Sequence, residues 1–476
     1  FKADNNQTYL TAIDPYHFLG SSKLYYLNNY VGTDIVDGEI KNNLRVAPFG
    51  TAGVENPELH IVLESLFFKF NGLDNNSSFG EYTGAVFILS ALISILVVIP
   101  IFMIIRHFSN NLFALFGTLI LLTVGTFVSR TVAGFVDTDA YQILFPLSIT
   151  AFLIYSLINK NKYVGILLSA LSGLCFGLFI WAWSSGWFFF VFILSALVIY
   201  LSYLLISYFI NKSEDIKLIL KSNILLLITF IISTFVFVKY FTNQNIFTST
   251  IMGLFGGLGG VTSISISNIW PNVATSVAEL NPASFGQIIS SVGGALVFLI
   301  AMIALVFLVL EYTPLNSKQK LYKRLVLIFS FIWTVLFINN TFTFLAANNS
   351  FLFVGLLFLP VAVAMILALI NGNNSIKIFM SMLLSIWMAG TIYMSFNGVR
   401  FILLLAPAVA VSAGIGLYYI YIVCNNFFEK ELKPKSFIGK QLGGLLVSSI
   451  VFLTIFTPMY THCLLYTSPS PRDGLL

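Results

Sequence analysis

The sequence predicts an all-α polytopic membrane protein with about twelve membrane-spanning helices. Of its 476 residues 58% are hydrophobic and only 9% are charged, and the mean hydropathy is +0.92. The apolar residues form repeated segments of about 20, the length that crosses a bilayer as a helix. This composition excludes an ordinary soluble domain. The net charge of +5 does not indicate a nucleic-acid partner, because the basic residues lie in loops between the apolar segments and form no single patch.

The apolar segments divide the chain into five parts. Residues 1–82 form a first long external loop, residues 83–241 contain six spans, residues 242–288 form a second long loop, residues 289–462 contain six more spans, and residues 463–476 resemble translated sequencing-adaptor DNA. The predicted spans are 83–106, 111–129, 141–158, 163–183, 187–210, 222–241, 289–311, 322–339, 350–370, 376–395, 401–422 and 442–459. Within the first loop, an apolar helical pattern covers Leu59 to Phe70.

Basic residues predict the orientation of the chain. Most of the 24 Lys and Arg lie in alternate loops, beginning with the loop after the first span, and such loops face the cytoplasm. These residues are Arg106, Lys160, Lys162, Lys212, Lys217, Lys221, Lys318, Lys320, Lys323, Arg324, Lys377, Lys430, Lys433, Lys435 and Lys440. Both long loops and the loop at 129–140 then face outward, so we expect the chemistry on the extracytoplasmic side of a cell membrane.

The loop at 129–140 is the most charged short loop on that outer face. It reads Ser-Arg-Thr-Val-Ala-Gly-Phe-Val-Asp-Thr-Asp from Ser129 to Asp139 and lies between two apolar segments, so we expect a short turn at the membrane surface. Ionisable groups at such a place are costly and often functional. Asp137 and Asp139 offer the hard oxygen ligands that Mg²⁺ or Mn²⁺ prefers, and Arg130 can hold the loop or contact an anion. A loop whose charges only anchor helix ends is the alternative.

Three further charged residues share the outer face. Asp14 precedes Pro15 and favours the start of a helical turn, Glu279 is the only acid of the second long loop, and Arg400 opens a long apolar span. Each also has a purely structural interpretation, as a helix cap, a solvated loop charge and an interfacial anchor. Together, acids and arginines on one face suit transfer from a phosphate-linked lipid donor, because a divalent metal and an arginine neutralise the charge on the leaving phosphate.

These motifs resemble the catalytic subunit of oligosaccharyltransferase, closest to the single-subunit archaeal and bacterial type. The resemblance rests on Asp-Pro-Tyr at Asp14, on the Asp-Thr-Asp loop, on Ser-Val-Ala-Glu-Leu-Asn-Pro around Glu279, and on Val-Arg-Phe at Arg400. It implies a GT-C-type helix bundle of thirteen spans, and one span upstream of the twelve found here would give that number. The family also carries a C-terminal globular domain with a Trp-Trp-Asp-Tyr-Gly signature. No Trp-Trp pair occurs here, so we expect a fragment that lacks this domain and its recognition of the acceptor Ser or Thr, and that is poorly active at best.

The resemblance also implies an activity and residue roles. The family transfers an oligosaccharide, with inversion, from a lipid-linked oligosaccharide donor on polyprenyl phosphate or diphosphate to the Asn side chain of an acceptor polypeptide bearing Asn-X-Ser/Thr. By that resemblance, Asp14, Asp137, Asp139 and Glu279 are expected to bind Mn²⁺ or Mg²⁺ or the acceptor amide. Arg130 is expected to support them, and Arg400 to contact the donor phosphate or the acceptor. His17 and His60 are the remaining external histidines and are candidates for contacts behind these ligands, although ordinary polar contacts are commoner.

Two other functions remain open at this point. A different lipid-sugar-dependent glycosyltransferase of the same membrane architecture, such as a protein O-mannosyltransferase, would share the external acids but should lack the Ser-Val-Ala-Glu element. A transporter or flippase would place its polar residues near the bilayer midplane on broken helices, often in inverted repeats. No such repeat is visible in the sequence, and the ionisable residues lie at loop positions.

Overall fold

The computed structural model describes residues 8–45, 49–243, 278–310, 317–371 and 375–431, with short pieces around 245–250 and 444–456. Most of the second long loop, including Ser276 and Val277 of the Glu279 motif, lies outside the described residues. So do Lys433, Lys435 and Lys440, which were predicted to face the cytoplasm, and the tail at 463–476.

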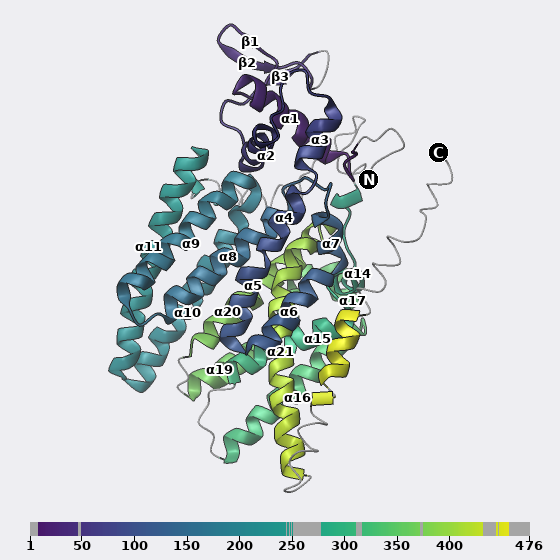
Figure 1. Ribbon diagram of the computed structural model, residues 1–476. Coiled ribbons are helices and arrows are strands. Elements are labelled where there is room, and N and C mark those ends of the chain that lie inside the picture. Colours follow the sequence, from purple (N-terminus) through teal and green to yellow (C-terminus); the bar gives the residue numbers. More distant parts are fainter. Residues whose placement is uncertain are drawn as a thin grey trace, which may run out of the picture.

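The described chain is almost entirely helical, which confirms the predicted fold class (Figure 1). Its helices are α1 (Asp14–Asn28), α2 (Leu59–Phe70), α3 (Phe79–Val86), α4 (Leu89–Leu96), α5 (Val98–Phe108), α6 (Asn111–Thr123), α7 (Gly125–Thr131), α8 (Asp139–Ile158), α9 (Lys162–Ala182), α10 (Trp187–Asn211), α11 (Glu214–Thr242), α14 (Phe285–Ser291), α15 (Gly294–Leu310), α16 (Ser317–Ile338), α17 (Thr343–Asn348), α18 (Ser350–Leu357), α19 (Leu359–Ile370), α20 (Ile376–Ser395) and α21 (Ile402–Glu431). Three short 3₁₀ turns are η1 (Ser184–Gly186), η2 (Ala278–Leu280) and η3 (Val399–Phe401).

Eight helices of the described chain are long and apolar enough to cross a membrane, and up to 11 spans result if each bent helix pair counts as one. The shorter apolar helix Val447–Phe456 lies within the last predicted span. The surface of the bundle supports a membrane location: Ile88, Leu92, Ile95 and Ile99 recur at helical spacing and are all exposed. Large apolar side chains on one outer stripe are stable when they face lipid.

Three of the predicted spans are broken rather than straight. The chain bends by 65° between α6 and α7, by 90° between α14 and α15, and by 46° between α18 and α19. At the first break Val124 takes an extended conformation that ends α6 and starts α7. Arg130, expected in a turn, therefore lies on the last turn of a short helix that points along a new direction.

Small residues let the spans pack closely. In α9, a Cβ added at Gly173 would lie 2.0 Å from Ser233 Oγ, and one added at Gly177 would lie 2.6 Å from Phe237 Cβ, both on α11. Ser169 of the same helix donates a hydrogen bond to the Leu226 carbonyl of α11 (2.7 Å). Close backbone approach and interhelical hydrogen bonds are the main stabilising contacts between helices in lipid, where burial of apolar surface contributes little.

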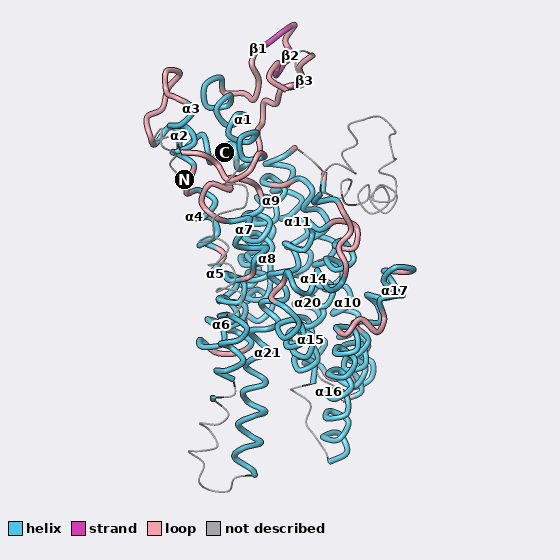
Figure 2. Tube along the Cα trace, turned by 90° about the vertical axis from the view of Figure 1, so that its right-hand side faces the viewer, coloured by secondary structure: helices cyan, strands magenta, loops and turns pink. Residues whose placement is uncertain are grey.

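The first long loop is a folded unit at one end of the bundle, which the sequence described only as a loop with one helix (Figures 1 and 2). The predicted helix at Leu59–Phe70 is confirmed as α2. A three-stranded antiparallel sheet accompanies it, formed by β1 (Asp34–Val36), β2 (Glu39–Asn42) and β3 (Thr51–Ala52) in the order β1-β2-β3. Trp181, at the end of α9, donates its indole N–H to the Pro57 carbonyl (2.9 Å) and joins this unit to the bundle.

Candidate active site

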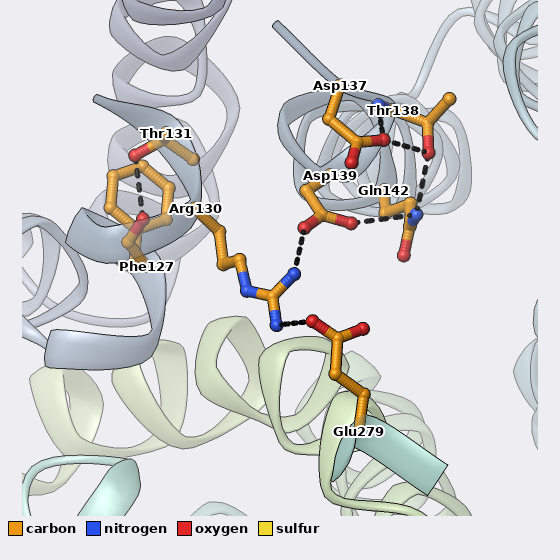
Figure 3. A network of polar contacts seen from close by, with 8 residues as sticks. All are labelled: Phe127, Arg130, Thr131, Asp137, Thr138, Asp139, Gln142 and Glu279. Atoms are coloured by element: carbon orange, nitrogen blue, oxygen red, sulfur yellow. Dashed lines mark hydrogen bonds and ion pairs between the residues drawn. The ribbon is translucent and has the colours of Figure 1, made fainter. Parts of the chain in front are cut away.

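The Asp-Thr-Asp loop joins α7 to α8 at the end of the bundle that carries the folded first long loop. This loop, residues 8–82 of the described chain, is called the first external unit after its predicted side of the membrane. Asp139 is the first residue of α8, where a carboxylate interacts favourably with the helix dipole. The backbone N–H and the hydroxyl of Thr138 both donate to Asp137 Oδ1. The side-chain amide of Gln142 donates to Asp139 Oδ1 and to Thr138 Oγ1, and both distances are 3.1 Å (Figure 3). The two aspartates are therefore held in fixed orientations.

Arg130 connects this loop to the second long loop (Figure 3). Its guanidinium lies 3.4 Å from Asp139 Oδ2 and pairs with Glu279 Oε1 through its other terminal nitrogen. These contacts are only partly screened, because the Arg130 and Glu279 side chains are 29% and 36% exposed. An arginine between two carboxylates neutralises charge that would otherwise keep the two loops apart.

Backbone hydrogen bonds hold the Glu279 segment against the end of α20 and against η3. Val399 donates to the Asn281 carbonyl (2.9 Å), and Ala283 donates to the Ser395 carbonyl (3.1 Å). Glu279 lies on η2 and Arg400 on η3, so these bonds set the two predicted site residues side by side. Residues more than a hundred positions apart in the sequence thus form one wall of the site.

The first external unit is attached to the Asp-Thr-Asp loop at Gly134. Thr11 donates to the Gly134 carbonyl (3.1 Å), and Gly134 donates to the Phe87 carbonyl (2.7 Å). Gly134 has φ +90°, and an added Cβ would lie 2.8 Å from the Phe87 ring. Glycine is the residue that accepts both this backbone conformation and this close approach. Asp14 follows Thr11 by three residues and begins α1, as the Asp-Pro pair predicted.

These segments enclose a cavity of about 430 Å³. The predicted residues that line it are Asp14, Arg130, Asp137, Asp139, Glu279 and Arg400. Residues from both long loops, the Asp-Thr-Asp loop and the start of α21 therefore meet at one concave surface, which is the arrangement expected of a binding site.

The predicted histidines lie outside this cavity. His17 lines a neighbouring cavity. His60 is only 1% exposed, its ring contacts Phe18 edge-on at 4.7 Å between centroids, and its Nδ1 lies 3.5 Å from Glu58 Oε2. Burial lowers the pKa of His60 to about 4, so it is neutral at pH 7. His60 thus reaches the site only indirectly, through Phe18 and Glu58, which both line the first cavity.

The cavity carries an excess of negative charge. Five carboxylates line it, those of Asp14, Glu58, Asp137, Asp139 and Glu279, against the two guanidinium groups of Arg130 and Arg400. Burial raises the pKa of Asp137 above its usual range, and the negative charge of Asp14 adds to this effect. Carboxylates in such surroundings favour a bound cation, because it compensates both desolvation and mutual repulsion.

The comparisons with known proteins agree with this arrangement. The family model described as "Oligosaccharyl transferase STT3, N-terminal" matches residues 1–466. The chain belongs to the STT3 oligosaccharyltransferase family. This assignment favours the predicted family over protein O-mannosyltransferases and over transporters.

Two curated STT3 relatives are dolichyl-phosphooligosaccharide-protein glycotransferases. The chain is 26% identical to that of Methanococcus voltae over 453 residues, which cover 90% of this chain and 44% of the relative. It is 23% identical to that of Methanocaldococcus jannaschii over an alignment 544 positions long, and the match covers 97% of this chain and 50% of the relative. The chain therefore spans about half the length of the curated relatives it matches.

Solved structures of the archaeal oligosaccharyltransferase AglB from Archaeoglobus fulgidus have the same fold. The structure in complex with an inhibitory peptide and a dolichol-phosphate matches with a TM-score of 0.51 at 14% identity, over 96% of this chain and 52% of that one. The complex with Zn and sulfate matches with a TM-score of 0.52 at 12% identity, over 97% of this chain and 50% of that one. These similarities confirm a GT-C-type membrane bundle for this STT3 chain.

A metal site of the expected kind is not assembled in the described part of the chain, where no three His, Cys, Asp or Glu side chains are close enough to share one ion. The reason is visible at Arg130, which takes a place between Asp139 and Glu279. The donor set still fits a divalent cation, because oxygen ligands and an excess of negative charge are both present at the cavity. Release of both Glu279 and Asp139 from Arg130 would free the two carboxylates.

Several cavity residues were not found from the sequence of this STT3 chain. Thr138 and Gln142 position the two aspartates, Trp183 and Phe18 line the wall, and Glu58 adds a fifth carboxylate. Gln142 had a signal, since it is a buried amide one turn after Asp139 in an apolar span. The others lie in segments where polar or aromatic residues are common, so nothing in the sequence distinguished them.

Proposed function

We propose that this protein transfers an oligosaccharide from a polyprenyl-phosphate-type carrier to the Asn side chain of Asn-X-Ser/Thr sites, on the extracytoplasmic face of the cell membrane. The observation that carries the proposal is the meeting of Asp14, Arg130, Asp137, Asp139, Glu279 and Arg400 at one cavity. Family membership supports it, as do AglB structures that contain a dolichol-phosphate or a tethered acceptor peptide with the NVT sequon.

The acceptor nitrogen requires help, because an amide lone pair is delocalised into its carbonyl. Asp14 and Glu279 lie on the same cavity and can each accept one N–H of the acceptor amide. Two such hydrogen bonds twist the amide out of conjugation and orient its nitrogen towards the sugar. Arg130 holds Glu279 until the acceptor amide replaces it as the partner of that carboxylate.

The donor phosphate is the leaving group. The amide nitrogen forms a bond to the anomeric carbon, the bond from that carbon to the phosphate oxygen breaks, and the phosphate keeps the electron pair. The nitrogen then loses one proton to a neighbouring carboxylate. Arg400 lines the same cavity on η3 and can pair with the departing phosphate through charge-assisted hydrogen bonds.

Mn²⁺ or Mg²⁺ would be held by Asp14, Asp137, Asp139 and Glu279 in this proposal. When bound, such an ion neutralises charge that develops on the phosphate. The hydrogen bonds from Thr138 and Gln142 would keep the two loop aspartates aligned for it. The net negative charge of the cavity supports a divalent ion but does not distinguish these two.

A transfer assay tests the proposal. The protein in nanodiscs is given lipid-linked oligosaccharide extracted from membranes of its source organism and a fluorescent peptide with an Asn-Val-Thr site. We expect a glycopeptide to form, and we expect Glu279→Gln to reduce kcat at least hundredfold. Glu39→Gln, an exposed residue of β2, is the matched control and should have no effect. Transfer to a peptide in which Gln replaces the acceptor Asn, or full activity of Glu279→Gln, would contradict the proposal.

A further inference from the structure

A second cavity of about 400 Å³ adjoins the first and has no part in the mechanism above. Phe18 and Glu58 line both cavities, so they form the wall between the two. The second cavity lies between the first external unit and the ends of α9 and α11. Its volume is in the range of small-molecule binding pockets.

The aromatic part of the second cavity is held rigidly. Trp181 and Phe241 stack with ring centroids 5.0 Å apart and an angle of 5° between their planes. The indole N–H of Trp181 is already bonded to the Pro57 carbonyl, so the ring offers only apolar surface to a ligand. Because the ring is fixed before a ligand arrives, little conformational entropy is lost on binding.

The polar part combines neutral hydrogen-bonding groups with one permanent cation. His17, Ser21, Asn56 and Arg45 all line the cavity. Burial lowers the pKa of His17, and the charge of Arg45 lowers it further, whereas Asp14 acts in the opposite direction. His17 is therefore neutral at pH 7, with one donor and one acceptor nitrogen. No ion pair of Arg45 is found among the described residues, so its guanidinium can serve a ligand.

We propose that the second cavity binds the distal sugars of the oligosaccharide donor, those beyond the sugar that is transferred first to the acceptor. This inference rests on the proposed function, because the reducing end of the glycan must lie in the first cavity. A sugar ring has one apolar C–H face and a rim of hydroxyls that both donate and accept. The second cavity presents the complement: an aromatic platform beside amide, hydroxyl and imidazole groups.

Continuity of the two cavities favours sugars over the acceptor polypeptide. The first cavity must already hold the acceptor side chain, the phosphate and one sugar near its seven charged residues. The rest of the glycan then has to leave that cavity, and the second one begins directly behind Phe18 and Glu58. Arg45 adds a preference for distal sugars that carry a carboxylate, through charge-assisted hydrogen bonds.

Donor binding, measured without transfer, tests this assignment. Two donors are compared on the protein in nanodiscs by their Kd: the lipid-linked oligosaccharide pool from the source organism, and the same pool trimmed by glycosidases to its first sugar. The wild-type protein should bind the full donor about tenfold more tightly. Arg45→Gln and Asn56→Ala change exposed residues, so both variants should fold normally. Their affinity for the full donor should fall about tenfold, and their affinity for the trimmed donor should not change. Lys41→Gln, an exposed cation on β2, is the control that should behave as wild type.

Each other outcome has a definite meaning. Equal Kd values of the two donors for the wild-type protein would overturn the assignment, and so would variants that weaken both donors equally. If the two variants bind the acceptor peptide more weakly but bind both donors as the wild type does, the cavity belongs to the acceptor and the sugar assignment is overturned. If the expected pattern of donor binding is seen but no glycopeptide forms in the transfer assay, the sugar site stands and the proposed function fails.

Discussion

The guanidinium of Arg130 pairs with both Asp139 and Glu279, two carboxylates that lie 140 positions apart in the sequence. It therefore fixes the second long loop to the Asp-Thr-Asp loop at the centre of the cavity. A single cation that bridges two loops has two effects: it positions their carboxylates, and it competes with any other cation for them. Substitutions at Arg130 separate these effects.

Arg130→Gln should reduce kcat for glycopeptide formation about hundredfold, because Glu279 loses the partner that orients it. The same change should leave the affinity for Mn²⁺ unchanged or increase it, since a competing positive charge is removed. Steady-state kinetics and Mn²⁺ titration by electron paramagnetic resonance measure the two quantities. Arg106→Gln, at the end of α5, is the control without effect. Weaker Mn²⁺ binding by Arg130→Gln would show that Arg130 supports the ion rather than competes with it.

Metal removal gives a second prediction. The carboxylates of the cavity repel one another, so Mn²⁺ should raise the melting temperature of the protein, and chelation by EDTA should reverse this. Asp137→Asn should abolish the effect, because it removes a half-buried carboxylate whose pKa is raised by burial and by Asp14. Differential scanning fluorimetry measures both proteins with and without the ion. Asp37→Asn, in the turn between β1 and β2, should keep the full response. A shift with Mn²⁺ that survives in Asp137→Asn would remove Asp137 from the ligand set.

Gly134 carries the third prediction, because its backbone joins the first external unit to the Asp-Thr-Asp loop. Gly134→Ala places a Cβ at φ +90° and 2.8 Å from Phe87, so it should destabilise the protein by about 1–3 kcal/mol and reduce kcat by displacing Asp14. Gly38→Ala is a matched control, with φ +82° but open space around its Cβ. It should cost only about 1 kcal/mol and leave kcat unchanged. Equal kcat values for the two variants would mean that Gly134 does not position Asp14.

Charged residues made much of the site predictable from the sequence. In a chain that is 9% charged, an ionisable group between apolar segments is costly, so Arg130, Asp137 and Asp139 were visible as candidates. Asp14, Glu279 and Arg400 became candidates because they share the predicted outer face and because their motifs resemble those of the family. All six line the cavity. Their roles in catalysis and metal binding remain predictions. Glu58 and Trp183 were not predictable, because their contribution comes from how the first external unit packs on the bundle.

Helix direction was harder to predict than helix presence. The spans were recognised by their apolar length, but residues 111–129 read as one continuous apolar segment, and no proline or charge marks the break at Val124. The 65° bend there depends on tertiary contacts, such as the hydrogen bond from Thr126 to the Ser291 carbonyl (3.0 Å). For the same reason, the position of Arg130 between Asp139 and Glu279 could not be predicted from the sequence.

Glu64 carries the last prediction, which concerns pH. This α2 residue is 1% exposed, and burial raises its pKa from 4.5 to about 8, with a further contribution from the charge of Asp137. A hydrogen bond from the Ser22 hydroxyl would lower the pKa of Glu64. That hydroxyl donates to the Phe18 carbonyl (2.9 Å), so burial dominates. A raised pKa in the folded state stabilises the protein below pH 4.5, and this stabilisation is lost as the pH rises towards 8, by about 1.4 kcal/mol per pH unit.

The melting temperature of the wild-type protein should therefore fall between pH 5 and pH 8 more steeply than that of Glu64→Gln, which cannot ionise. The comparison is made between the two proteins at each pH, because other groups titrate in this range. His60, with its pKa lowered to about 4, acts in the opposite direction: its neutral burial costs stability as the pH falls below 6.5. That contribution is common to both proteins and cancels in their difference. Parallel curves for the two proteins would show that Glu64 is ionised in the folded state. Its burial makes that unfavourable, because no cation pairs with it among the described residues.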